Sequence, residues 1–300
     1  MIAHLKSSTK GELLIFSEAL IWSLFPVLSI LTFSTLPPLF TAAFATIFSS
    51  FFFAIVLTYK KLWKECSRNA PWKDIFLCSL FIGCIFYALL FTGMRNTTAG
   101  NASIVLLMEV FFFFLILGVL IKHEPIQSKQ ILGGICMMIG AAFILFPKSS
   151  GWHSGDIFIF FACMFTPIGN YFMQRARKSV SSEFILFVRS VISGIFLLIL
   201  ATFLEPMPSQ TSLISSCAFL FVNGFLMLGF SKILWLESIT LIPMTKAISL
   251  ASIGPFFTMI FAYFILHEKV TTYQVLGFVP IVLGVLLLTQ WQGRLENNYR

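Results

Sequence analysis

Ten apolar stretches, each close to 20 residues long, follow one another along the chain of 300 residues. A helix needs about 20 apolar residues to cross the hydrocarbon core of a bilayer. The stretches are continuous and too long for the alternating strands of a membrane barrel. The sequence therefore predicts an all-α integral membrane protein with ten transmembrane helices. The predicted helices cover residues 12–32, 36–59, 73–93, 98–120, 128–146, 156–174, 182–204, 213–236, 241–266 and 272–291.

The overall composition excludes a water-soluble domain. Hydrophobic residues make up 58% of the chain and charged residues only 11%, whereas soluble domains carry about 25% charged residues. A net charge of +8 would suit nucleic acid, but the basic residues lie in short segments between the apolar stretches. That distribution is typical of the positive-inside rule. We therefore expect a lipid bilayer as partner and no nucleic acid.

The loop charges also predict an orientation. With the N-terminus inside, the cytoplasmic segments hold 14 Lys and Arg residues and the opposite segments hold three. Because basic residues accumulate on the cytoplasmic side, we expect a multi-pass protein of the cell (inner or plasma) membrane with both termini in the cytoplasm.

One stretch of the sequence occurs twice, 144 residues apart. Residues 104–140 and 248–284 align without a gap and share 12 of 37 positions. Seven of the shared residues are Ile, Leu or Phe, which this composition supplies by chance, but five are polar residues or Gly. These five pairs are His123/His267, Glu124/Glu268, Gln130/Gln274, Gly133/Gly277 and Gly140/Gly284. The chain therefore divides into two repeats, residues 1–147 and 148–300.

Each repeat would contain five helices, and this odd number inverts the second repeat in the membrane relative to the first. The loop charges agree, because residues 60–73 include five basic residues and the equivalent loop at 205–212 has none. The predicted fold is thus two five-helix inverted-topology repeats. Inverted repeats that enclose a site near the membrane midplane are typical of transporters that work by alternating access.

Each repeat ends in an apolar helix, a Glu, a short turn, Gln-x-x-Gly and a later Gly. These residues are Glu124, Gln130, Gly133 and Gly140 in the first repeat and Glu268, Gln274, Gly277 and Gly284 in the second. With ten helices in 300 residues, the whole chain resembles the EamA-type family of the drug/metabolite transporter superfamily. The resemblance implies a central cavity lined chiefly by helices 1, 3, 4, 6, 8 and 9. It also implies solutes as varied as amino acids, nucleotide-like metabolites and amphipathic drugs.

Glu109 is the sharpest candidate for a functional residue. The family often has Glu-Pro in the middle of the fourth helix and Pro in the ninth; Glu109 and Pro255 match, but Val110 replaces the first Pro. We therefore expect a straighter fourth helix. Glu109 lies about 16 Å into that helix, where an ionisable group costs about 2.5–3.5 kcal/mol and marks a functional site by default. It would bind an ammonium group or couple transport to protons, or else serve assembly through an interhelical hydrogen bond.

Glu18 and Trp22 lie one turn apart on the first predicted helix and therefore share a face. Pro26 follows on that face and is expected to bend the helix. The indole of Trp22 would stack on a planar or cationic substrate, or would belong to an interfacial aromatic belt.

Three basic residues lie inside predicted helices near their cytoplasmic ends. Lys246 is followed at helical spacing by hydroxyl residues, among them Ser249, which marks a polar stripe expected to face the cavity and suits an anionic substrate group. Arg189 would pair with such an anion or with Glu18. We interpret Lys232 as a residue that snorkels to the membrane interface.

Three uncharged polar residues are further candidates for the cavity wall. They are Asn223 near the middle of the eighth helix, Asn170 in the sixth and Tyr87 in the third. Such side chains also serve as interhelical contacts worth about 0.6 kcal/mol each.

The repeated His-Glu pairs occupy equivalent turns on opposite sides of the membrane, so they cannot share an ion, and no metal or cofactor is expected. The repeated glycines, seven residues apart, would suit a contact between helices 5 and 10 or a homodimer seam.

The leading hypothesis is a secondary transporter that moves an amino acid or related zwitterionic metabolite, with drug efflux as a variant and with proton coupling. An uptake or exchange carrier for a nucleotide-like or S-adenosylmethionine-like metabolite is an alternative. A channel or membrane scaffold belongs to another class, although the rings of charge typical of channels are not visible. We do not expect an enzyme, because no HExxH, paired mid-membrane Asp or Ser/His pair is present.

Overall fold

The computed structural model describes residues 7–66, 69–116, 128–146, 153–242 and 244–298. Over these residues the chain is helical, with no strand, so the all-α prediction is confirmed. Eight of the helices are long and apolar enough to cross a membrane, and two further apolar helices, at 131–145 and 272–288, are shorter. Each falls on one of the ten predicted stretches. Their arrangement as two inverted repeats stays a prediction.

The helices form two compact units, and each unit takes segments from both halves of the sequence. Unit 1 comprises residues 1–27, 96–160 and 231–300, and unit 2 comprises residues 28–95 and 161–230. The helices that lie wholly or mostly in unit 1 are α1 (Ser7–Trp22), α6 (Ala99–Leu106), α7 (Met108–Phe113), α8 (Ser128–Leu145), α9 (Ser154–Cys163), α13 (Ser231–Leu241), α14 (Met244–Ala251), α15 (Gly254–Ile265) and α16 (Thr272–Asn298). Those of unit 2 are α2 (Leu24–Thr32), α3 (Pro38–Tyr59), η2 (Leu62–Glu65), α4 (Trp72–Cys78), η3 (Ser79–Phe86), α5 (Tyr87–Arg95), α10 (Phe165–Ala176), α11 (Ser182–Leu204), α12 (Gln210–Phe221) and η5 (Val222–Phe230).

Proline interrupts three of the membrane helices. Pro26 and Pro167 are each the third residue of a helix that follows a one-residue break, and Pro255 is the second residue of α15. A proline removes the amide hydrogen that would bond four residues back and clashes with that turn. The predicted bend at Pro26 is confirmed, because Ser23 forms a turn between α1 and α2.

The fourth membrane helix breaks without a proline. Between α6 and α7, the amide of Leu107 donates to the carbonyl oxygen of Ile104 at 3.1 Å, and the amide of Val110 donates to that of Leu107 at 3.1 Å. In these bonds the amide donates to the residue three positions back rather than four, which tightens the helix locally. The fourth helix is therefore broken although Val110 replaces the proline, so the expectation of a straighter helix is wrong. The break lies two residues before Glu109.

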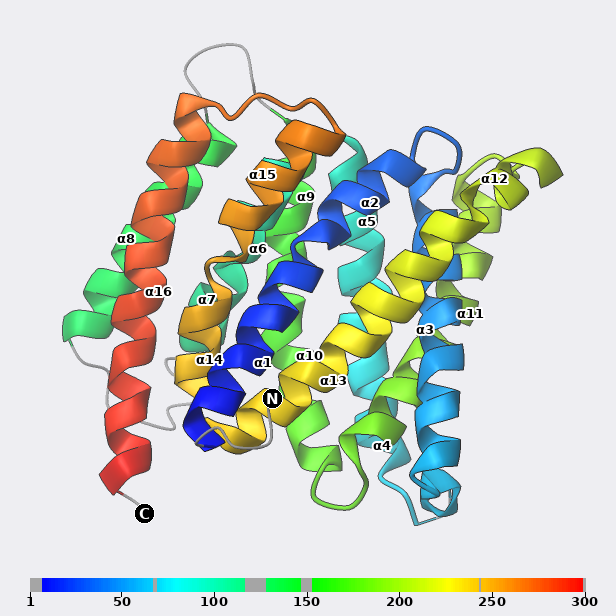
Figure 1. Ribbon diagram of the computed structural model, residues 1–300, viewed down its shortest axis with the longest axis horizontal. Helices are drawn as coiled ribbons and strands as arrows, with labels where there is room; N and C mark the ends of the chain where they lie inside the picture. Colours follow the sequence, from blue (N-terminus) through cyan, green and yellow to red (C-terminus); the bar gives the residue numbers. More distant parts are fainter. Residues whose placement is uncertain (1–6, 67–68, 117–127, 147–152, 243, 299–300) are drawn as a thin grey trace. The chain divides into compact units, whose positions relative to one another are not determined.

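Glycines bring α8 and α16 into close contact in unit 1, where the two helices lie side by side (Figure 1). A Cβ atom added at Gly133 would lie 3.0 Å from the carbonyl oxygen of Gly284, and one added at Gly140 would lie 2.5 Å from that of Gly277. This crossed pairing makes the helices antiparallel. Of the two uses predicted for the glycines, the contact between helices 5 and 10 is confirmed, so a homodimer would have to use another surface.

We predict that Gly140→Ala destabilises the protein by about 1–3 kcal/mol, because the new methyl group overpacks a backbone contact. Gly134→Ala, on the same helix, is the control, since its Cβ atom would lie 3.4 Å from the Phe111 ring, an ordinary contact. Thermal unfolding in detergent measures both variants. Equal midpoints for the two would contradict the close α8–α16 contact.

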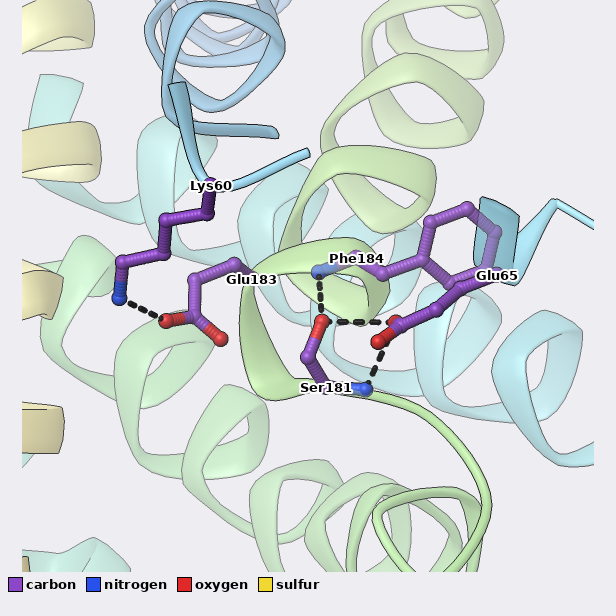
Figure 2. Close-up of polar contacts among 5 residues, drawn as sticks. All are labelled: Lys60, Glu65, Ser181, Glu183 and Phe184. Carbon is purple, nitrogen blue, oxygen red and sulfur yellow. Dashed lines mark hydrogen bonds and ion pairs between the residues drawn. The ribbon is translucent and has the colours of Figure 1, made fainter. Parts of the chain in front are cut away.

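Two carboxylates tie α3 and α11 together in unit 2. Glu205, which follows α11, accepts hydrogen bonds from the amides of Leu39 and Phe40 at the start of α3, at 3.0 and 3.2 Å. Glu65, which follows α3, accepts at 2.8 Å from the amide of Ser181, the residue that caps α11 (Figure 2). Carboxylates satisfy the unpaired amides of a helix start. The exchange also fixes the two helices as antiparallel.

The two ends of the α3–α11 pair carry different charged groups. Burial raises the pKa of Glu205, against the opposing effect of the bonds from the α3 amides. At the other end the ammonium of Lys60 lies 2.6 Å from a carboxylate oxygen of Glu183, close to the bond between Glu65 and Ser181 (Figure 2). Both ends of the pair are therefore held by groups that are far apart in the sequence.

We predict that Ser181→Ala lowers the stability by about 1–2 kcal/mol, the usual cost of losing a helix cap. The Ser181 hydroxyl donates to Glu65 at 2.7 Å and accepts from the amide of Phe184 at 3.3 Å, and both bonds would be lost. Ser179→Ala, at an exposed residue two positions earlier, should leave the unfolding midpoint unchanged. A loss of similar size in both variants would argue against the cap.

Candidate functional site

Glu18 lies in α1, ten residues into the span Ser8–Thr32, or about 15 Å at 1.5 Å per residue. The residue is 3% exposed. Its carboxylate lies 3.5 Å from the ammonium of Lys232 on α13, and α1 and α13 pack against each other in unit 1. A charged group in apolar surroundings must be paired, so this ion pair accounts for the burial of Glu18.

The same ammonium lies on the aromatic face of Trp22. The Lys232 Nζ atom is 3.4 Å from the centre of the Trp22 ring, well within the range of a cation–π interaction. The phenyl ring of Phe25 stacks on the indole with centroids 4.6 Å apart and an angle of 4° between the planes. Trp22 therefore binds a cation on one face and is held by an aromatic ring on the other.

Glu109 is the second carboxylate near this ammonium. It lies in the first turn of α7, is half-buried, and feels the charge of Lys232. Like Glu18, it lies ten residues into its span, Ala99–Ile116. Unit 1 thus places a carboxylate and an indole against one ammonium, and the charge of that ammonium also acts on Glu109. We call these four residues the Lys232 cluster: Glu18, Trp22, Glu109 and Lys232.

The interpretation of Lys232 as a snorkelling residue is wrong. The sequence ended the eighth helix at residue 236, whereas the span Gln210–Leu241 runs to Leu241. Lys232 is therefore nine residues, or about 14 Å, from the end of its helix. Its side chain is only 23% exposed. The predicted helix ends five residues before the observed one, so the prediction placed Lys232 too close to the end of its helix.

Lys246 forms a different ion pair of unit 1. It lies in the first turn of α14, and its ammonium is 2.5 Å from a carboxylate oxygen of Glu12 on α1, with both side chains exposed. Ser249 follows on α14 and is half-buried. Contact between Lys246 and a substrate anion stays a prediction, and it would require this ion pair to open.

Arg189 and Asn223 belong to unit 2. Arg189, on α11, is 8% exposed, and within the described ranges no carboxylate lies close enough to form an ion pair with it. Asn223 is fully buried on η5; its side-chain amide donates to the hydroxyl of Ser29 at 2.9 Å, and its Oδ1 atom has no partner among the residues described. A buried carbonyl oxygen without a partner is a group that a ligand could satisfy.

The remaining two candidates also lie in unit 2. Tyr87, at the start of α5, is buried, and its ring packs edge-on against that of Phe91 at 6.2 Å. Asn170, on α10, donates to the carbonyl oxygen of Thr166 at 2.8 Å within its own helix. Their role as cavity residues stays a prediction.

The repeated Glu and Gln of the second half have structural contacts. Glu268 accepts hydrogen bonds from the amide of Ala99, which starts α6, at 3.1 Å, and burial raises its pKa. Gln274 donates to the side chain of Asn101 at 2.9 Å, and Asn101 donates to buried Asp156 at 2.8 Å. These bonds join the starts of α6, α9 and α16 within unit 1, as expected for a structural motif. The first-half Glu124 lies outside the described residues.

The family comparison agrees with this architecture. The model of the EamA-like transporter family matches the chain twice, over residues 9–146 and 153–290. The matches cover nearly the whole chain, and the chain therefore belongs to the EamA-like transporter family. It is a multi-pass membrane protein of the drug/metabolite transporter superfamily.

Several relatives are similar along most of the chain. A protein of Methanothermobacter thermautotrophicus named an uncharacterized transporter is 30% identical over 230 residues, which are 73% of this chain and 65% of that protein's length. The uncharacterized transporter YoaV of Bacillus subtilis is 23% identical over 72% of this chain and 75% of its own. An uncharacterized transporter of Archaeoglobus fulgidus is 24% identical, with 75% and 78% covered.

A crystal structure of another protein has a similar fold. It matches this chain with a TM-score of 0.65, covers 96% of this chain and 99% of its own, and has 13% sequence identity. At that identity, the likeness concerns the fold alone.

We predict that Glu18→Gln costs about 3 kcal/mol of stability, because it leaves a largely buried ammonium without its nearest counter-charge. Glu12→Gln is the matched control: it removes the partner of Lys246 on the same helix, and exposed pairs are worth less than about 1 kcal/mol. Thermal unfolding in detergent at pH 7 gives the comparison. If Glu12→Gln cost as much as Glu18→Gln, the Lys232 cluster would not be a buried ion pair.

Proposed function

We propose that the chain is a secondary transporter that moves a small organic solute across the membrane by alternating access. Ten transmembrane helices would form two five-helix repeats of opposite orientation, residues 1–147 and 148–300. A site near the midplane would open first to one side and then to the other. The solute would be an amino acid or a related zwitterionic metabolite, because it has to match buried groups of both charge signs.

The spacing of the two halves supports the repeats. The two family matches start at residues 9 and 153, and this offset of 144 residues also separates the two copies of the duplicated stretch. The unusual segments η3 and η5, which wind as π-helices, begin at Ser79 and Val222, within one residue of the same offset. The first two signals come from the sequence, and the third comes from the backbone geometry.

Helix direction supports the inversion. By the 144-residue offset α11 is the equivalent of α3, and α16 that of α8. Each equivalent pair packs within one unit, and each is antiparallel, as shown by the contacts of Glu65 and Glu205 and by the paired glycines. Equivalent helices of opposite direction are what an inverted repeat would produce.

The Lys232 cluster is the observation that carries the proposal. Burying charges in the middle of apolar helices is costly, and in membrane proteins such groups mark substrate or ion pathways. Unit 1 holds two carboxylates, Glu18 and Glu109, beside one ammonium. One further positive charge, from a proton, would balance them. We propose that Glu109, which has no direct ion pair in the described structure, accepts that charge.

Two further features complete the proposal. Arg189 in unit 2, buried and without a carboxylate partner among the described residues, is a separate candidate for contact with an anionic group, since a guanidinium binds carboxylate through two parallel hydrogen bonds. The excess of basic residues in alternate loops would place both termini in the cytoplasm and the protein in the cell membrane.

We predict saturable flux of amino acids into proteoliposomes that hold the purified chain, and an altered rate when a pH gradient is imposed. Glu109→Gln should remove the effect of the gradient, because its amide cannot take up a proton. Glu237→Gln, at an exposed residue of α13, is the control and should retain the effect. Radiolabelled uptake with and without the gradient measures both.

Two outcomes would contradict the proposal. Equal gradient dependence in Glu109→Gln and Glu237→Gln would remove the coupling role of Glu109. An ion conductance that does not saturate and that passes solutes of either charge would replace the transporter with a channel.

A further inference from the structure

The Lys232 cluster holds a cation that belongs to the protein itself. The ammonium at the end of the Lys232 side chain lies 3.4 Å from the centre of the Trp22 ring and 3.5 Å from a carboxylate oxygen of Glu18. A π face and a carboxylate are the two elements by which proteins recognise organic ammonium ions. The groups around Lys232 are therefore those of an ammonium-binding site, filled by a side chain.

The geometry of Trp22 leaves no second place for a ligand. Phe25 stacks almost parallel to the indole on one side, and an ammonium at 3.4 Å from the ring centre must lie on the other side, because the stacked phenyl ring would clash with it. An incoming cation can thus reach the Trp22 ring only where the Lys232 ammonium lies. Binding of such a cation and the present position of Lys232 exclude each other.

Two features of Lys232 would favour its release from this position. Its side chain is 23% exposed, whereas that of Glu18 is 4% exposed, so the lysine is less enclosed than its carboxylate partner. The 3.5 Å separation is long for a charge-assisted hydrogen bond, which is typically about 2.7–2.9 Å. A flexible lysine stem also has many rotamers available once released.

The surrounding charges favour a cation over an anion. Glu18 and Glu109 both act on Lys232, so an anion approaching its ammonium would meet two carboxylates. A second ammonium meets the same two carboxylates as attractive partners. The cluster is therefore built to exchange one cation for another.

We propose that Lys232 is a tethered, displaceable occupant of an ammonium site formed by Trp22, Glu18 and Glu109, and that the solute's ammonium group replaces it. This inference rests on the proposed transport function, since it names the part of the solute that the site recognises. In the empty carrier, the lysine is the counter-charge of the buried Glu18 carboxylate. When the solute binds, its ammonium group takes over that role and Lys232 is released.

The test measures binding of n-butylammonium, which copies the end of a lysine side chain, to the purified full-length chain by calorimetry in detergent. Lys232→Met removes the ammonium while keeping most of the apolar stem of the side chain, and it should bind the probe at least about tenfold more tightly than the wild type. Lys232→Arg keeps a tethered cation and should bind as weakly as the wild type. Lys232→Gln, which can still donate a hydrogen bond to Glu18, serves if Lys232→Met does not fold and should show the same gain.

The gain must depend on the other members of the site. Combining Lys232→Gln with Trp22→Leu, or with Glu18→Gln, should return the affinity to the wild-type level. The proposal would be overturned if the wild type and the neutral variants bound the probe equally, or if the gain persisted in either double variant.

The two proposals fail in different ways. Binding of n-butylammonium needs no transport, so absence of flux in proteoliposomes together with a gain in Lys232→Met would remove only the transport function. Amino acid flux together with equal affinities in all variants would remove only the displaceable lysine.

Discussion

One ammonium group, that of Lys232, is the counter-charge of the carboxylate that α1 brings into the apolar interior of unit 1. Glu18 is 3% exposed and has Lys232 as its ion-pair partner, while Glu109 shares the field of the same lysine. Charges at this depth are expensive without compensation. The packing of α1 against α13 brings Glu18 and Lys232 together. Helix breaks at Ser23 and Leu107 lie close in sequence to Trp22 and Glu109.

The sequence predicted most of the fold, because long apolar runs leave a chain few alternatives. Positions and lengths of the helices followed from hydrophobicity, and the bend at Pro26 followed from the missing amide hydrogen. The break at Leu107 could not be predicted, since no proline or glycine marks it. The glycines signalled a close contact, but the periodicity alone could not decide between a partner helix and a second copy of the chain. The mixing of both sequence halves in each unit was also not visible, because hydrophobicity carries no information on which helices pack together.

The site was predicted in part, and the reasons for the difference are physical. Glu18 and Trp22 were found because their spacing places them on one helix face. Lys232 was missed because its partners Glu18 and Trp22 lie on another helix, and the sequence does not show which helices pack together. Lys246 was expected to contact a substrate anion, and the structure pairs it with Glu12 at an exposed position. The sequence could not predict this ion pair, because the partner lies on another helix. The buried Arg189 stays a candidate for binding a carboxylate.

The central claim is that the solute's ammonium group takes the place of Lys232 on Trp22. An aromatic ring shields nuclei that lie over its face, so NMR of the chain with isotope-labelled lysine reports this position directly. The account predicts that the Lys232 side-chain signal is shifted upfield in the empty carrier, and that a transported solute returns it to the range of a lysine in water. Trp22→Leu should abolish the upfield shift without any solute. A Lys232 signal that stays upfield at a solute concentration that saturates transport would contradict the account.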